Sequence, residues 1–216
     1  MVRRAVAEAL GTAFLLAAVV GSGIMGERLA GGNIAIALLA NTLATSATLI
    51  ALILTFGPIS GAHFNPAVTL ASALRRDLAW GDAPAYVCAQ IAGAFAGVAA
   101  AHLMFGHPVF FASLQERSGS AQLFSEFVAT FGLLCVIFGC ARRNPPAVPF
   151  AVGAYIAGAY WFTSSTSFAN PAVTLARAAS NTFAGIRPVD VTGFVAAQLI
   201  GAIAATALFQ WMNDER

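Results

Sequence analysis

The heptapeptide Asn-Pro-Ala-Val-Thr-Leu-Ala occurs twice in this chain, at residues 65–71 and again at residues 170–176. Seven consecutive identities, each placed between long apolar stretches, indicate an internal duplication rather than a coincidence. Asn is among the preferred residues at the N-cap of a helix, and Pro is favoured at the first helical position. Each copy therefore predicts a helix that starts at its Asn-Pro pair.

The composition is that of a membrane protein with several spans. Hydrophobic residues make up 59% of the 216 residues and charged residues only 9%, against about 25% charged residues in soluble domains. A helix needs about 20 apolar residues to cross the hydrocarbon core. Six stretches have about that length: residues 5–25, 34–56, 84–105, 121–141, 148–166 and 189–212. We expect the first to be a span, because it is too long for a cleaved signal peptide.

The duplication extends beyond the heptapeptide. Glu8 opens the stretch EALGTAFLL in the first span, and Glu126 opens EFVATFGLL in the fourth. The third and sixth spans share an Ala-Gln pattern, AQIAGA from residue 89 and AQLIGA from residue 197. We therefore expect one domain over residues 1–216 with two repeats, residues 1–115 and 116–216. Three spans is an odd number, so the second repeat enters the membrane from the opposite side, as in many transporter folds.

The segments that begin at the two Asn-Pro pairs are too short to cross. About ten residues follow each pair before Arg76 or Asn181, which is about 15 Å of helix, or half of a ~30 Å hydrocarbon core. In inverted repeats, two such half-helices meet at the bilayer centre by their amino ends. The non-helical residues before them are tolerated only when buried in protein or facing a water-filled cavity. The sequence thus predicts an all-α membrane protein with six spans and two re-entrant half-helices around a pore.

The arginines predict the orientation. The eleven Lys and Arg residues are all arginine, with adjacent pairs at residues 3–4, 75–76 and 142–143 and single arginines that include residues 28, 117 and 187. Because positive charge favours the cytoplasmic side, we expect a multi-pass protein of the inner (plasma) membrane with both termini in the cytoplasm. No basic stripe or stacking platform indicates nucleic acid as a partner.

These features together resemble the aquaporin and glycerol-channel superfamily over essentially the whole chain. The residues that carry the resemblance are the intramembrane glutamates, the Ala-Gln patterns and the paired pore motifs Asn65, Pro66, Ala67 and Asn170, Pro171, Ala172. The resemblance implies a right-handed bundle, a homotetramer in the lipid bilayer with one pore per subunit, and passive flow of small uncharged molecules without a cofactor or metal.

The resemblance also implies roles for polar residues at membrane depth. The amides of Asn65 and Asn170 donate hydrogen bonds to a passing oxygen, while the facing helix amino ends repel cations. Glu8 and Glu126 are costly there unless paired. They either relay protons or, as in the family, accept hydrogen bonds from the backbone of the adjacent re-entrant loop. His63 either offers a ring nitrogen or its carbonyl to the pore, or packs.

The selectivity filter departs from the family. Most members of the family have the sequence Asn-Pro-Ala-Arg in the second motif, whereas this chain has Val173 in place of that arginine. Counting back from the two asparagines without gaps places the other filter positions at Thr45, Gly158 and Ser167. This wide, uncharged ring suits hydroxylated solutes larger than water, such as glycerol or arsenous acid, and resembles the bacterial branch of the family associated with arsenic resistance. A water-selective channel is the alternative.

Arg177 complicates this prediction, because it lies four residues after Val173 on nearly the same helix face and about 6 Å further outward. It either restores positive charge at the outer mouth without narrowing the filter, or it extends to the membrane interface or satisfies loop carbonyls. Two functions of other classes are also open. A pore-occluded structural or adhesion protein needs bulk where this chain has small residues, and an intramembrane enzyme needs motifs such as HExxH or GxSxG, which the sequence lacks. We expect no enzymatic activity.

Overall fold

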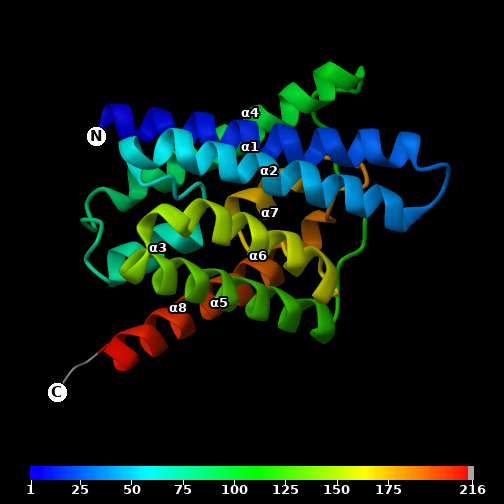
Figure 1. Cartoon of the computed structure of the whole chain (residues 1–216). Coiled ribbons are helices and arrows are strands. Elements are labelled where there is room, and N and C mark those ends of the chain that lie inside the picture. The colour runs from blue at the N-terminus through cyan, green and yellow to red at the C-terminus, as the bar shows by residue number, and fades with distance from the viewer. Residues whose placement is uncertain (214–216) are drawn as a thin grey trace.

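The computed structural model describes residues 1–213, and over that range the chain is built from helices (Figure 1). The all-α prediction is confirmed. The α-helices are α1 (Val2–Leu29), α2 (Ile34–Ser60), α3 (Pro66–Leu74), α4 (Ala83–Phe105), α5 (Ser120–Arg143), α6 (Val148–Phe162), α7 (Pro171–Arg177) and α8 (Val191–Asn213). Short 3-10 turns, Pro145–Ala147 and Pro188–Asp190, precede α6 and α8.

Five helices of the described chain, α1, α2, α4, α5 and α8, are long and apolar enough to cross a membrane. The fifth predicted span, residues 148–166, is shorter than expected, because α6 has only 15 residues and ends at Phe162. Thr163 adopts an extended conformation, with φ −107° and ψ 140°. The residues after it leave the helix to form the loop that leads into α7.

The helices run along one common direction, with α4 and α8 lying obliquely to the others (Figure 1). The start of α1 and the described end of α8 lie at the same end of the bundle, and the connection between α1 and α2 lies at the opposite end. The two ends are called the terminal end and the far end below. The short helices α3 and α7 lie between the long ones.

Glycines lie where α4 crosses α1 and where α8 crosses α5. A Cβ atom added at Gly93 or Gly97 of α4 would lie 2.2 Å from the carbonyl oxygen of Ala9 and 2.1 Å from that of Ala13, both in α1. At the equivalent crossing of α8 and α5, a Cβ at Gly201 would lie 2.6 Å from the oxygen of Phe127. Small residues let helix backbones approach closely in membranes, so these glycines set the packing of α4 and α8.

Candidate functional site

The two asparagines of the repeated motif cap their helices and also contact each other's loops. Oδ1 of Asn65 accepts from the amide of Ala67 (2.9 Å), and Oδ1 of Asn170 accepts from the amide of Ala172 (3.0 Å). Each side-chain nitrogen reaches across the bundle: Asn65 donates to the carbonyl of Ala169 (2.7 Å), and Asn170 donates to the carbonyl of Phe64 (2.8 Å). The amino ends of α3 and α7 are therefore joined by reciprocal hydrogen bonds.

The loops before the asparagines share an unusual backbone. Ala62 and Phe64 have φ of 50° and 49°, and their counterparts Ser167 and Ala169 have φ of 51° and 48°. These positions stand three and one residues before each asparagine. The left-handed region costs about 1–2 kcal/mol for a residue with a Cβ, and such strain persists only where the surroundings hold it. No sequence signal marks these positions, because none of them is Gly or Asn.

Glu8 of α1 holds the first of these loops. It is fully buried. Its carboxylate accepts hydrogen bonds from the amides of His63 (3.0 Å) and Phe64 (2.7 Å). The Ser60 hydroxyl (2.6 Å) and the Gln90 side chain (2.8 Å) also donate to it. A carboxylate with this many donors has its acceptor sites occupied by protein groups, so burial is compensated.

Glu126 of α5 makes the equivalent contacts in the second half. It accepts from the amides of Phe168 and Ala169, both at 2.9 Å, and from Nε2 of Gln198 at 2.6 Å. Gln198 also donates to Thr174 of α7 (2.8 Å).

The first half repeats this last contact as well. Gln90 of α4 donates both to Glu8 and to Thr69 of α3, the latter at 2.9 Å. The same hydrogen bonds therefore join α1, α4 and α3 in the first half and α5, α8 and α7 in the second.

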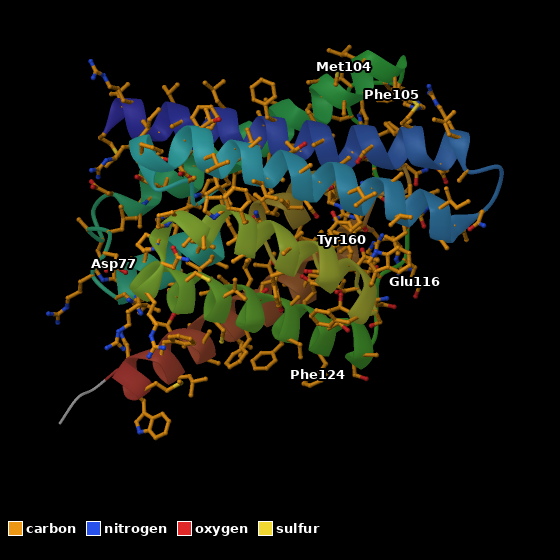
Figure 2. The ribbon with its side chains drawn as sticks, in the orientation of Figure 1. Asp77, Met104, Phe105, Glu116, Phe124 and Tyr160 are labelled. Atoms are coloured by element: carbon orange, nitrogen blue, oxygen red, sulfur yellow. The ribbon has the colours of Figure 1, made fainter. Side chains whose placement is uncertain are left out.

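A cavity of about 300 Å³ runs past both asparagines. Its wall includes Arg75 and Asp77, and Asp77 lies at the terminal end (Figure 2). It also includes Tyr160, which lies toward the far end, where Glu116 is found (Figure 2). The long helices α1, α2, α5 and α6 contribute mainly apolar side chains spaced four residues apart: Leu15, Val19, Leu49, Ile53, Leu133, Ile137, Val148, Val152 and Ile156.

Three of the four predicted filter residues lie in the cavity wall: Thr45, Ser167 and Val173. The fourth, Gly158, does not, and that prediction is wrong. Gly158 is exposed on the outer face of α6, because the cavity-lining residues recur every four positions, through Ile156 to Tyr160. Tyr160 takes the place predicted for Gly158, and its hydroxyl donates to the Thr45 hydroxyl (3.4 Å).

Ser167 and Arg177 each have hydrogen-bonding capacity that no group of the described chain uses. The Oγ atom of Ser167 is buried and has no hydrogen-bond partner within the described chain. Arg177 also lines the cavity and is 3% exposed. Its Nε donates to the carbonyl of Ala184, and its guanidinium carbon lies 3.4 Å from the ring centroid of Phe168. Arg177 therefore satisfies a loop carbonyl and lines the cavity at the same time.

Arg117 is a residue whose contacts the sequence did not indicate. Its Nε donates to the carbonyl of Gly185 (2.8 Å), and Nη1 donates to the carbonyl of Ser165 (3.1 Å). Its guanidinium carbon lies 4.9 Å from the centroid of the same Phe168 ring. Burial lowers the pKa of Arg117. This arginine joins the connection between α4 and α5 to the loop before α7, and a single arginine in a loop carried no signal of that contact.

The connection between α4 and α5 is also bonded to Asp190, which forms an ion pair with Arg187. Asp190 accepts from the backbone amide of Arg117 (2.9 Å) and from the side chain of Arg187 (3.0 Å). The hydrogen bond from Arg187 is the main cause that lowers the pKa of the Asp190 carboxyl. Arg187 also contacts Glu116 at 3.2 Å.

His63 lies in the cavity wall, and both of its ring nitrogens lie within hydrogen-bonding distance of hydroxyl groups of α3. Nδ1 lies 3.1 Å from the hydroxyl of Thr69, and Nε2 lies 3.4 Å from the hydroxyl of Ser72. Its ring also packs against Tyr86 at a centroid distance of 5.2 Å. At the terminal mouth of the cavity, Arg75 pairs with Asp77 at 3.0 Å.

Comparisons with known proteins agree with this architecture. The family model described as "Major intrinsic protein" matches residues 1–157. The chain is similar to aquaglyceroporin AqpS of Rhizobium meliloti (strain 1021), at 57% identity over 98% of this chain and 91% of that protein. It is also similar to aquaporin NIP1-3 of Oryza sativa subsp. japonica, at 34% identity over 94% of this chain and 71% of that protein.

A solved structure shows the same fold. The aquaglyceroporin from Plasmodium falciparum superposes with a TM-score of 0.76 at 20% identity, covering 96% of this chain and 95% of that one. The family model and the near full-length relative decide the classification: this chain belongs to the major intrinsic protein family.

Proposed function

We propose that this chain is a passive channel for small uncharged solutes, with arsenous acid and polyols such as glycerol as its preferred solutes and water as a lesser one. The family and the near full-length aquaglyceroporin relative support a membrane channel for small solutes rather than an enzyme. The preference for larger hydroxylated solutes rests on the filter region. There Val173 supplies an apolar wall in place of an arginine, and Ser167 supplies a buried hydroxyl that has no hydrogen-bond partner among residues 1–213.

The paired asparagines provide the central contact with the solute. Each side-chain amide has two hydrogens, and the bond across the bundle uses one of them. Because both asparagines line the cavity, the second hydrogen is available to the oxygen of a passing neutral molecule. The mainly apolar wall offers few groups to replace the hydration shell of an ion, so a neutral hydroxylated solute passes more easily than an ion does.

One observation favours a second candidate, a water-selective channel. Tyr160 lies in the cavity wall where a glycine was expected, and an aromatic ring at this level narrows the opening. Its hydroxyl lies 3.4 Å from the Thr45 hydroxyl on the facing helix. The two candidates differ in the ratio of glycerol to water permeability.

The test is a flux measurement in proteoliposomes with water, glycerol and arsenous acid side by side. Empty vesicles of the same lipid are the control. We expect all three solutes to cross faster than in empty vesicles, with glycerol and arsenous acid strongly accelerated. Acceleration of water alone would establish the water-selective candidate. No acceleration of any solute would support a pore-occluded structural or adhesion role.

We further propose that the protein is a homotetramer in the inner membrane with its termini in the cytoplasm. The arginine pairs at residues 3–4, 75–76 and 142–143 support this orientation. Single cysteines at Asp77 and Glu116, which lie at opposite ends of the bundle (Figure 2), test it after replacement of the three native cysteines. A membrane-impermeant thiol reagent applied from outside intact cells should label position 116 and spare position 77. Native mass spectrometry of the detergent-solubilised protein measures the number of subunits.

A further inference from the structure

Two arginines, Arg117 partly buried and Arg177 buried, approach the same aromatic ring, and they differ in how many of their N–H donors have a protein acceptor. Arg117 and Arg177 lie with their guanidinium carbons 4.9 Å and 3.4 Å from the ring centroid of Phe168. Arg117 donates through Nε and Nη1 to the protein. Arg177 donates only through Nε, to Ala184, within the described residues.

Arg177 lines the cavity, so its remaining donors are close to it. A guanidinium carries five N–H groups, so four of them, on the two Nη atoms, have no acceptor in the described chain. Arg177 forms no ion pair with a carboxylate there either. A buried charge needs compensating partners, and the cavity that Arg177 lines is where water or a solute can provide them.

Ser167 is a second and independent sign of a ligand at this level. Ser167 is 3% exposed and lies in the cavity wall, and its Oγ has no hydrogen-bond partner in the part of the chain that the structure describes. It directly precedes Phe168, whose ring packs against Arg177. Val173 lies one helical turn before Arg177 in α7 and is part of the same wall.

We propose that Arg177 is the cationic donor of the filter, acting one turn outward from Val173. With the hydroxyl of Ser167 it binds the oxygens of a neutral solute that carries several hydroxyl groups, and its charge repels cations. The ring of Phe168 and the carbonyl of Ala184 hold the guanidinium in place. This inference rests on the proposed function, and it assigns a share of cation exclusion to Arg177, because the side chain of Val173 carries no charge.

The experiment measures potassium leak and the permeabilities of water, glycerol and arsenous acid in the same proteoliposomes. Arg177→Gln removes the charge and should raise potassium leak several-fold and lower the ratio of glycerol to water permeability several-fold. Arg177→Lys keeps the charge without the planar fork, so it should keep potassium out while the ratio still falls. Arg28→Gln is the control, because Arg28 is an exposed arginine at the end of α1.

A rescue separates this role from a merely structural one. Combining Val173→Arg with Arg177→Gln moves the charge one turn inward, and it should restore potassium exclusion although the bond to Ala184 is lost. If Arg177→Gln does not reconstitute, Arg177→Lys and the double variant decide. An unchanged leak in Arg177→Gln, an unchanged ratio in Arg177→Lys, or a double variant that still leaks overturns the inference while leaving the channel intact. A wild-type protein that passes no solute above empty vesicles refutes the proposed function and, with it, this inference.

Discussion

Asn65 and Asn170 each donate a side-chain hydrogen bond to the loop that precedes the other, at 2.7 Å to the carbonyl of Ala169 and at 2.8 Å to the carbonyl of Phe64. The two asparagines come from opposite halves of the chain, 105 positions apart. Their reciprocal bonds join the amino ends of α3 and α7, so each half of the protein positions the loop of the other.

The first prediction concerns Asn65→Asp. Asp caps a helix as well as Asn does, but an aspartate oxygen cannot donate to the carbonyl of Ala169. We expect a loss of about 1–3 kcal/mol in the free energy of unfolding, because a buried acceptor loses its partner, together with an increased cation leak. Denaturation in detergent measures the first effect and potassium flux measures the second.

Asn33→Asp is the matched control for this substitution. Asn33 caps α2 through the amides of Ala35 and Ile36 and is exposed. We expect its variant to stay close to wild type in stability. Equal stability losses at positions 33 and 65 would contradict a special role for the cross-loop bond.

The second prediction is that Glu8→Gln destabilises the first re-entrant loop. A glutamine offers one acceptor oxygen where the carboxylate offers two, and its NH₂ group would face donors such as the amide of His63 or Phe64. Buried donors left unsatisfied cost about 1–3 kcal/mol each, so we expect a lower midpoint of thermal unfolding in detergent. Glu116→Gln serves as the control, because Glu116 is an exposed loop residue. A comparable shift for both variants would argue against the loop-holding role of Glu8.

The third prediction tests the packing of α4 on α1. Gly97→Ala places a Cβ 2.1 Å from the carbonyl oxygen of Ala13, so the two helices must separate. Overpacking of this kind costs about 1–3 kcal/mol. Gly139→Ala in α5 meets nothing within 4 Å and should change stability by at most about 1 kcal/mol in the favourable direction. Unfolding curves of the two variants, compared in one detergent, test the difference.

The fourth prediction concerns Val173→Arg, which puts a long cation beside Thr45, Tyr160 and Ser167 in the cavity wall. Glycerol and arsenous acid, which need width, should slow much more than water, which passes in single file. The three permeabilities are compared in the same vesicles after matching the protein content. If arsenous acid and water fell by the same factor, Val173 would be acting on folding rather than on the width of the filter.

Much of the fold could be predicted because its signals are local or repeated. The Asn-Pro pairs predict where α3 and α7 begin, and Asn65 and Asn170 are the N-caps of those helices in the structure. The apolar stretches predict where the spans lie, although α6 is shorter than its apolar stretch. The lengths of α3 and α7, nine and seven residues, are close to half a crossing.

The filter could be predicted only in part. Thr45, Ser167 and Val173 reach the cavity, but Gly158 does not, because which face of α6 lines the cavity depends on how residues 163–169 fold between α6 and Asn170. In this chain, cavity wall, helix packing and lipid-facing surface are all apolar. Hydrophobic periodicity therefore cannot distinguish the lining face from the others.

The sequence by itself determined the duplication, the membrane class, the helix starts and the glutamates at membrane depth, because each is written in contiguous residues. Only the tertiary structure decided the left-handed backbone at Phe64 and Ala169 and the position of Tyr160, rather than Gly158, in the cavity wall. It also decided the different contacts that Arg117 and Arg177 make around the ring of Phe168. These features depend on groups far apart in the chain. Their energies arise from burial and hydrogen bonds that exist only once both halves have closed around the same cavity.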